Sequence, residues 1–337
     1  MKNWLWAVSI AWFLAGCGGE GSTPTTPPSP KATTTVNVEE ATITFSGTVT
    51  NIVTSAKVVG AVVTIGATSA TSGTDGTYTL TVPASEQTNF SAAASGYYTR
   101  ESTVSMSGAT TINLEIIPQG DGFDLTFFDY LFRDNGTRGT ERYVNPPTYE
   151  IWTRQFTCLE LSSDGWNACV RMQALEAEVP AQFETLVRGA LAKIGQLTGG
   201  AVTDVTITTK SHTPGTILQR NDWGTAPGVV SIEYQTEGLW VDDNGGYDAC
   251  FCSRRDDAEP GHIVYGTSSG LDQSIHEHEV GHSLGFSHPS GQPTLATFMK
   301  DWPYEISPGD ELHGLIMHSR PKGSLSPDRD PEGVTIN

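Results

Sequence analysis

The chain has 337 residues, which is enough for two domains of ordinary size, each with its own hydrophobic core. Its 38 acidic and 19 basic residues give a formal net charge of −19 at pH 7. A charge of this sign repels phosphate groups, so the sequence argues against nucleic-acid binding. Only 37% of the residues are hydrophobic, while glycine and β-branched residues are frequent, so the composition favours short strands and turns over a helical bundle.

The first residues have the pattern of an export signal. Lys2 supplies a positive charge, residues 4–13 form an apolar core, and Leu14-Ala15-Gly16-Cys17 resembles a bacterial lipobox. The resemblance implies cleavage before Cys17 and lipid attachment at that residue, because several acyl chains are needed for durable anchoring. An uncleaved membrane anchor is the alternative, although the apolar core is short for a spanning helix. We therefore expect residues 1–16 to be a signal peptide, and the mature protein to be exported and lipid-anchored to the bacterial outer membrane or cell surface.

Residues 17–40 have the composition of a disordered tether. Gly, Ser and Thr surround four prolines in this segment, namely Pro24, Pro27, Pro28 and Pro30. Such a composition cannot bury enough apolar surface to order itself. We expect this segment to hold the folded part of the chain away from the membrane.

Residues 41–118 are predicted to form an all-β module, because short alternating runs are separated by turn residues. Asp75-Gly76 favours a hairpin turn, since Gly tolerates positive φ and Asp bonds its own backbone. The module resembles the carboxypeptidase regulatory-like family at Ser46-Gly47-Thr48-Val49, Ala61 to Ile65, Thr74-Asp75-Gly76-Thr77-Tyr78 and Ser95-Gly96-Tyr97. The resemblance implies a transthyretin-like β-sandwich, which would be either a spacer or an accessory domain that binds protein or glycan.

A second domain is predicted for residues 119–337. Apolar residues recur at helical spacing from Phe183 to Ile194, between Pro180 and Gly199-Gly200. β-branched runs follow at residues 202–209, 229–234 and 262–265. These patterns predict an α+β fold in which an amphipathic core helix packs behind a sheet.

Besides Cys17, the chain has an even set of cysteines, namely Cys158, Cys169, Cys250 and Cys252. Disulfides are favoured over reduced thiols or a structural zinc site in a protein that is expected to be exported. Every pairing of the four is open at this point. A bond between Cys250 and Cys252 would close a very tight ring, so we favour two bonds that cross from Cys158 and Cys169 to that pair.

The stretch of residues 274–288 contains HExxHxxGxxH without a mismatch. On a helix, residues four apart differ by only about 40° around the axis, so His278 and His282 can share one ion. Gly285 can end the helix in a left-handed conformation and return the chain so that His288 reaches the same ion. Three neutral imidazoles leave one coordination position open, which is typical of a catalytic rather than a structural Zn²⁺ site.

Glu279 follows the first of these histidines directly. Its carboxylate is expected beside the metal rather than on it, where it can act as general base toward the attacking water. The alternative is an exposed helix end that carries three histidines by chance. The apolar Ile275, Val280 and Leu284 argue against that alternative, because they indicate a buried helix.

The same motif resembles the metzincin clan of zinc metallopeptidases, in which the helix packs beneath a sheet and a methionine-containing turn lies under the metal. The resemblance implies that Met317 forms this turn, because residues 315–318 and 324–327 are similar to the Met-turn and the helix start of matrixins and astacins. Met299 is the second choice. The methionine would be a packing residue and not a ligand. Astacins have a Tyr two residues later where this chain has Ser319, so no phenolic group is carried over.

The remaining candidates receive simpler interpretations. The other histidines are expected to support a metal ligand through a hydrogen bond or to lie at the surface, rather than to coordinate the metal themselves. They are His212, His262, His276, His313 and His318. Asp242-Asp243-Asn244-Gly245-Gly246 could supply oxygen ligands to Ca²⁺, although an acidic, glycine-rich loop is more often a solvated turn.

The sequence therefore predicts a monomeric, multi-domain protein in which a β-sandwich precedes an α+β metallopeptidase domain. The expected activity is zinc-dependent hydrolysis of internal peptide bonds in extracellular proteins or peptides, with Glu279 as general base. The alternative is a surface-anchored binding lipoprotein whose β-sandwich binds protein or glycan and whose second domain is an inert scaffold.

Overall fold

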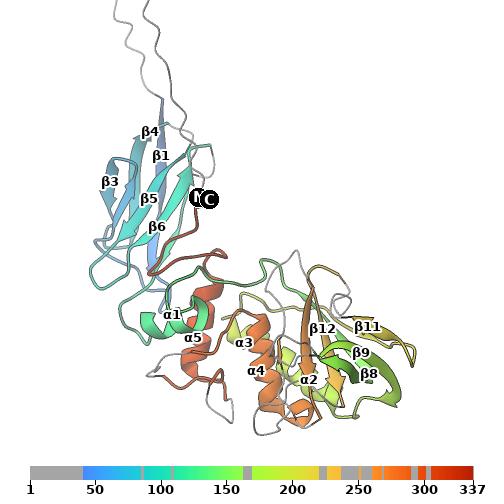
Figure 1. Cartoon of the computed structure of the whole chain (residues 1–337). Helices are drawn as coiled ribbons and strands as arrows, with labels where there is room; N and C mark the ends of the chain where they lie inside the picture. Colours follow the sequence, from blue (N-terminus) through green and yellow to red (C-terminus); the bar gives the residue numbers. More distant parts are fainter. Residues whose placement is uncertain are drawn as a thin grey trace, which may run out of the picture. The chain divides into compact units, whose positions relative to one another are not determined.

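The computed structural model describes residues 41–84, 87–107, 110–161, 169–219, 226–236, 250–251, 260–267, 269–289, 295–300 and 305–336. Within these ranges the fold is β-rich, with several sheets and a few helices (Figure 1). None of the described helices has both the length and the apolar character that a membrane crossing requires. The predicted signal peptide and tether lie outside the described residues, as do Cys17, Cys252 and the Asp242–Gly246 loop.

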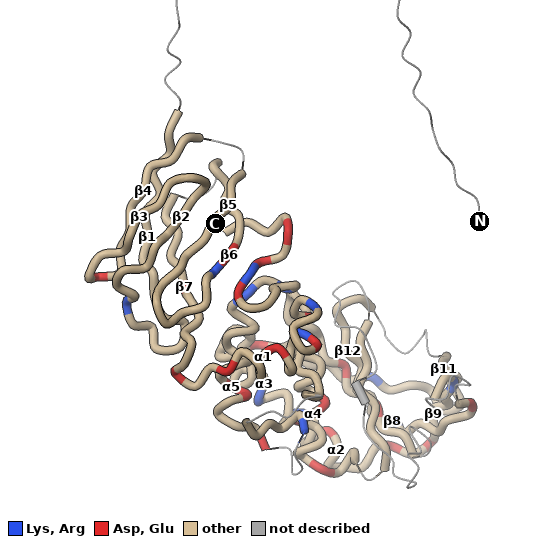
Figure 2. Tube along the Cα trace, turned by 60° about the vertical axis from the view of Figure 1, so that its left-hand side comes forward, with Lys and Arg blue, Asp and Glu red and all other residues tan. Residues whose placement is uncertain are grey.

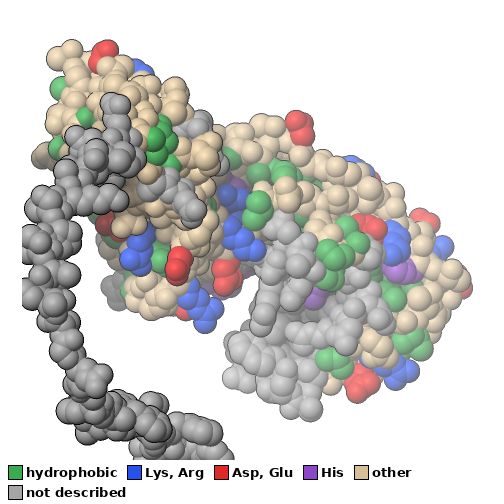
Figure 3. Space-filling view, turned by 90° about the horizontal axis from the view of Figure 1, so that it is seen from above, with side chains coloured by type: hydrophobic (Ala, Val, Ile, Leu, Met, Phe, Trp, Pro, Cys, Tyr) green, Lys and Arg blue, Asp and Glu red, His purple; other side chains and the backbone are tan. Residues whose placement is uncertain are grey.

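Two sheets face each other across a common core in the N-terminal part of the described chain. One has the order β4-β1-β7, with β1 (Thr42–Asn51), β4 (Thr77–Pro83) and β7 (Leu114–Ile116). The other has the order β15-β6-β5-β2-β3, with β2 (Val62–Ile65), β3 (Thr68–Thr71), β5 (Gln87–Ala93), β6 (Arg100–Ser105) and β15 (Thr335–Ile336). Alternate residues of β4 are buried, as expected for a strand with one face on a core. The surface over these strands is mostly neutral in the space-filling view (Figure 3).

The turn predicted at Asp75-Gly76 is present, but it is not a hairpin. Gly76 has a φ of 75°, and the Asp75 carboxylate accepts a hydrogen bond of 3.0 Å from the Thr77 amide. The strands on either side, β3 and β4, lie in different sheets. Local turn chemistry therefore predicted the reversal of the chain correctly, while the choice of sheet depends on contacts with more distant strands.

A third sheet has seven strands and runs β11-β9-β8-β12-β14-β13, with β10 also paired to β8. The strands are β8 (Thr148–Leu161), β9 (Cys169–Glu178), β10 (Ile207–Lys210), β11 (Ile217–Gln219), β12 (Val229–Gln235), β13 (Cys250–Phe251) and β14 (Gly261–Tyr265). Strands β8, β10, β12 and β14 are parallel, whereas β9, β11 and β13 pair antiparallel with their neighbours. The strands predicted at 229–234 and 262–265 are confirmed, and the run at 202–209 forms a strand only at its end.

Helices lie on one side of this sheet (Figure 1). They are α1 (Leu125–Phe132), α2 (Phe183–Leu191), α3 (Ile194–Leu197), α4 (Gln273–Ser283) and α5 (Pro308–His318), with a short 3₁₀ helix at Ser269–Leu271. Helices α2 and α4 contact strands of the sheet, while α5 packs on α3. Val230, Ile232 and Tyr234 of β12 pack against them in one core. Because side chains alternate along a strand, Ser231, Glu233 and Gln235 lie on the opposite face. The predicted core helix is confirmed as α2, which ends at Leu191.

The segment after α5 returns to the N-terminal sheets. β15 pairs in parallel with β6, and Ile336 packs against the N-terminal core. Arg100 of β6 bonds Asp328 at 3.1 Å and Asp330 at 2.7 Å, and all three side chains are buried. Figure 2 shows acidic and basic positions close together along this segment. The last described strand, β15, is therefore an edge strand of the sheet whose first strand in the sequence is β2.

One disulfide joins Cys158 to Cys169, with 5.7 Å between the Cα atoms. The crossed pairing that the sequence favoured is therefore wrong. Both cysteines lie in the antiparallel pair β8 and β9, which brings them close together, and this hairpin was not predicted from the sequence. Cys250 lies in β13, at the far edge of the same sheet order.

Candidate metal centre

The HExxH residues lie on α4, whose two ends follow from local sequence. Asp272 caps the first turn, since its carboxylate accepts a hydrogen bond of 2.9 Å from the Ser274 amide. The helix ends at Ser283, just before Gly285, which has a φ of 113°. A Cβ atom at Gly285 would lie 2.7 Å from the Glu141 carbonyl oxygen. Glycine is therefore required there both for the backbone angle and for the close approach.

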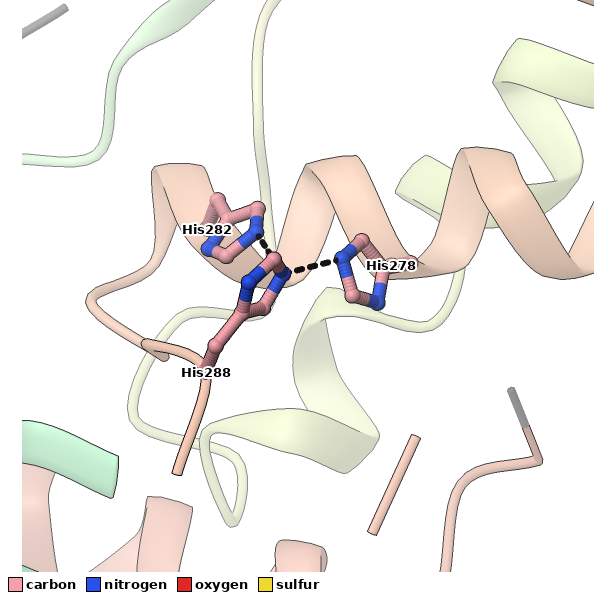
Figure 4. A group of neighbouring side chains, drawn as sticks. All are labelled: His278, His282 and His288. Atoms are coloured by element: carbon pink, nitrogen blue, oxygen red, sulfur yellow. Dashed lines mark hydrogen bonds between the residues drawn. The ribbon is translucent and has the colours of Figure 1, made fainter. Parts of the chain in front are cut away.

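The three histidines of the motif converge (Figure 4). The Nε2 atom of His288 lies 2.8 Å from Nε2 of His278 and 3.0 Å from Nε2 of His282. His278 and His282 come from consecutive turns of α4, and His288 comes from the loop that Gly285 turns back. His278 is buried, His282 is half-buried and His288 is exposed, so the group is open to solvent on one side.

Backbone carbonyls fix the tautomers of the two helical histidines. His278 Nδ1 lies 2.8 Å from the Phe298 carbonyl oxygen, and His282 Nδ1 lies 2.8 Å from the Phe286 carbonyl oxygen. A carbonyl can only accept, so each Nδ1 carries the proton and each Nε2 presents a lone pair. Burial lowers the pKa of His278 to about 4, which keeps this ring neutral at pH 7. Converging neutral Nε2 atoms with oriented Nδ1–H groups fit a divalent metal ion such as zinc.

Glu279 lies beside this group and is only 4% exposed. It is one residue after His278, which places it about 100° further around α4, between the metal face and the sheet. Its negative charge adds to burial in raising the pKa of Tyr265 on β14, so the carboxylate lies near the sheet-facing side of α4. The helix thus presents an acid next to the histidines without placing it among them.

Helix α1 holds the loop that carries the third histidine. The Ser287 amide donates a 2.8 Å hydrogen bond to the Leu131 carbonyl oxygen. Phe132 packs edge-on against Phe286 with 4.7 Å between ring centroids. Helix α1 was not predicted from the sequence, and its residues lie more than a hundred positions before the motif. No pattern local to the motif could have identified this contact.

A turn at residues 298–300 lies against α4 on the side of His278. A Cβ atom at Gly281 would lie 2.5 Å from the Phe298 ring and 3.1 Å from the Met299 sulfur, so glycine allows this approach. Met317 does not lie in a turn. It is buried near the end of α5, where its methyl group packs near Gly285, and residues 324–327 do not form a helix. Met299 therefore occupies the turn next to the histidines.

Asp310 anchors that turn. Its carboxylate is fully buried and accepts hydrogen bonds from Thr297 Oγ1 at 2.6 Å and from the Phe298 amide at 3.2 Å. It also accepts from the amide and hydroxyl of Ser307 at 2.9 and 2.8 Å, which forms a capping box at the start of α5. Sequence reasoning missed Asp310, although the S-P-G-D run at 307–310 has the capping-box pattern.

Two of the other histidines lie in the core away from the three converging histidines. His276 is buried, with Nε2 3.0 Å from the Gly270 carbonyl oxygen, and His313 stacks on Phe123. Among the described residues, the only cluster of His, Cys, Asp and Glu with metal-ligand spacing is His278, His282 and His288. The candidate calcium loop at residues 242–246 lies outside the described residues, so calcium binding there stays a prediction.

Comparison of the sequence with models of protein families and with curated proteins found no match in either case.

Proposed function

We propose that this chain is a zinc-dependent endopeptidase. The observation that carries the proposal is the convergence of three imidazole Nε2 atoms, two of them on the helix that also carries the buried Glu279. Three nitrogen ligands leave a coordination position free, which distinguishes catalytic zinc sites from closed structural ones. The exposed side of the group at His288 allows a polypeptide chain to reach it.

In this proposal His278, His282 and His288 hold the metal, and Glu279 is the catalytic acid and base. A zinc ion bound there would supply Lewis acidity, which polarises a carbonyl and lowers the pKa of water. Glu279 takes a proton from the attacking water and later delivers it to the nitrogen of the leaving amine. The Phe298 and Phe286 carbonyls keep the two helical imidazoles in the tautomer that this chemistry needs.

We further propose the family of the enzyme, the fold of its N-terminal part and its location in the cell. Residues 119–337 would be a metzincin-type peptidase domain, with Met299 rather than Met317 as the methionine below the metal. Residues 41–118 would be a transthyretin-like sandwich, and Cys17 the lipid anchor of an exported monomer. The Cys158–Cys169 disulfide supports export, because such bonds persist in oxidising compartments.

Metal analysis combined with casein cleavage tests this function. Purified wild-type protein should contain stoichiometric zinc and cleave casein. Glu279→Ala should keep the zinc and lose about 10²- to 10⁴-fold in rate, which is the usual contribution of a general acid or base. His288→Ala should lose both the metal and the activity.

Glu277→Ala is the matched control. It removes a carboxylate from the same helix, two positions away and about 200° around the axis from Glu279, so cleavage should be retained. Equal cleavage by wild type and Glu279→Ala would rule out the mechanism, and so would a wild-type protein that takes up no zinc after loading.

A further inference from the structure

A small pocket opens beside the third histidine. Its volume is about 260 Å³, and its lining includes Tyr130, Phe132, Asp134, Arg138, Glu141 and His288. Pockets that enclose a cofactor or a drug-sized molecule are usually larger, from about 300 Å³ upward. A pocket of this size next to a candidate metal ligand suits a single side chain of a bound polypeptide.

The walls of this pocket are held in place by contacts outside it. Arg133, at the end of α1, is buried and donates from Nε to the Ser324 carbonyl oxygen at 3.0 Å. A Cβ atom at Gly139 would lie 2.4 Å from the Gly323 carbonyl oxygen, so the two backbones are in close contact. The Leu131 carbonyl holds the loop of His288. The pocket is therefore formed before any substrate binds.

The charges in the pocket do not cancel. Arg138 pairs with Asp134 at 3.4 Å, and both side chains are exposed. Within the described part of the chain, the carboxylate of Glu141 has neither a hydrogen bond nor an ion pair. One negative charge thus remains uncompensated, close to the aromatic rings of Tyr130 and Phe132.

An uncompensated carboxylate beside aromatic rings is suited to a cation on an apolar stem. The rings can contact the methylene groups and attract the charge, while the carboxylate accepts hydrogen bonds from it. The formal net charge of −19 also attracts cationic peptides to the protein as a whole.

We infer that the pocket beside His288 selects substrates with a lysine or arginine close to the scissile bond, and that Glu141 is the specificity-determining residue. This inference rests on the proposed peptidase function. Glu141 and the Arg138–Asp134 pair are exposed, and exposed charges interact weakly, so we expect a preference of about tenfold rather than an absolute requirement.

Quenched fluorescent peptides that differ at one position test the inference. Lys, Leu or Glu is placed in turn at each position within three residues of the scissile bond, and kcat/KM is measured. Wild type should prefer Lys over Leu about tenfold at one position. Glu141→Gln should remove this preference, so that the ratio of kcat/KM for the Lys and Leu peptides falls to about one, and Glu141→Lys should favour the Glu peptide. Glu115→Gln, which removes an exposed carboxylate on β7, should behave as wild type.

A binding experiment separates failure of this inference from failure of the proposed function. Fluorescence anisotropy of the Lys and Leu peptides on Glu279→Gln measures discrimination without turnover, with and without Glu141→Gln. Discrimination that disappears with Glu141→Gln supports the pocket even if wild type cleaves nothing. Equal binding and equal cleavage of Lys and Leu peptides at every position would overturn the inference, even if casein is cleaved. So would a Lys preference that Glu141→Gln leaves unchanged.

Discussion

Glu233 shows how a single buried group can make stability depend on pH. It lies on β12, on the sheet face opposite the helices, and its side chain is fully buried. Ser231 Oγ donates a 3.2 Å hydrogen bond to it. Burial outweighs this bond and raises the pKa of Glu233 from its ordinary 4.5 to about 8, so the folded protein keeps the carboxyl protonated at pH 7. At any pH between 4.5 and about 8, Glu233 has lost its proton in the unfolded chain but keeps it in the folded protein. Stability therefore falls by up to about 1.4 kcal/mol per pH unit as the pH rises from 4.5 to 8.

Glu233→Gln should remove this pH-dependent loss, because the amide cannot ionise and has a similar shape. We expect the variant to gain stability relative to wild type as the pH rises from 5 to 8, with the two closest at pH 5. Urea unfolding at pH 5, 6.5 and 8 measures the free energy of unfolding of both proteins. The difference between variant and wild type reports the Glu233 carboxyl alone, because the other titrating groups contribute equally to both. Glu178→Gln, an exposed substitution at the end of β9, is the control. A constant difference between Glu233→Gln and wild type at all three values would contradict the assigned shift.

At the scale of elements, Asp310 links the start of α5 to the turn that orients His278. Its carboxylate bonds Thr297 and Phe298, and the Phe298 carbonyl in turn accepts from His278. Asp310 does not contact the three converging histidines, so its proposed part is to position one of them. In Asp310→Asn the amide group would face donors that now find a carboxylate oxygen, which leaves the turn less firmly held.

We expect Asp310→Asn to weaken zinc binding by up to about tenfold, because Asp310 acts one contact further out than the direct partners of a metal ligand, whose change typically costs about 10- to 100-fold. Competition with a chromogenic chelator measures the affinity. A purely structural role would lower only the stability of the metal-free protein. Glu311→Gln, the next residue on α5, is the control and should retain wild-type affinity. Unchanged zinc affinity in Asp310→Asn would show that the turn is held without this carboxylate.

The parts of the site that could be predicted are those that local geometry determines. The spacing of His278 and His282 and the turn at Gly285 follow from helix geometry, and the structure brings both histidines together with His288. Strand β12 and helix α2 were likewise apparent as apolar patterns. The contacts of the Phe298 carbonyl and of Leu131 were not, because neither is local to the motif. For Asp310, the capping-box pattern indicates a helix start but not the bonds to Thr297 and Phe298.

Two of the differences from prediction, those at Met317 and at the cysteines, have the same origin. Met317 was chosen from the residues around it, whereas α5 is defined by its capping box at Ser307 and Asp310 and extends through Met317. The cysteine pairing was chosen from ring strain alone, whereas the β8–β9 hairpin decides it. In both cases the missing information was the extent of an element, which depends on packing against distant parts of the chain.

At the scale of the whole molecule, a buried ion cluster joins the segment after α5 to the N-terminal sheets. Arg100 bonds Asp328 and Asp330, and Arg320 bonds Asp328 at 2.7 Å and donates to the Glu115 carbonyl oxygen of β7 at 2.9 Å. The strand pairing of β15 with β6 lies at the same place. Removing one partner of such a cluster leaves a buried charge without compensation, which usually costs about 3–5 kcal/mol.

Arg100→Met removes the charge but keeps most of the apolar stem, so its effect reports the ion cluster rather than a cavity. We expect a loss of about 3–5 kcal/mol in the free energy of unfolding, whereas Arg138→Met, which breaks the exposed pair with Asp134, should cost less than about 1 kcal/mol. Urea unfolding in low salt and in concentrated NaCl distinguishes the two. Salt screens exposed charges far more than buried ones, so the cost of Arg100→Met should persist while that of Arg138→Met fades. If the two substitutions cost the same, or if salt abolishes both effects, the ion cluster does not hold the C-terminal segment on the N-terminal sheets. The backbone hydrogen bonds of Glu101 with Asp328 and Asp330 and the pairing of β15 with β6 would then have to do so.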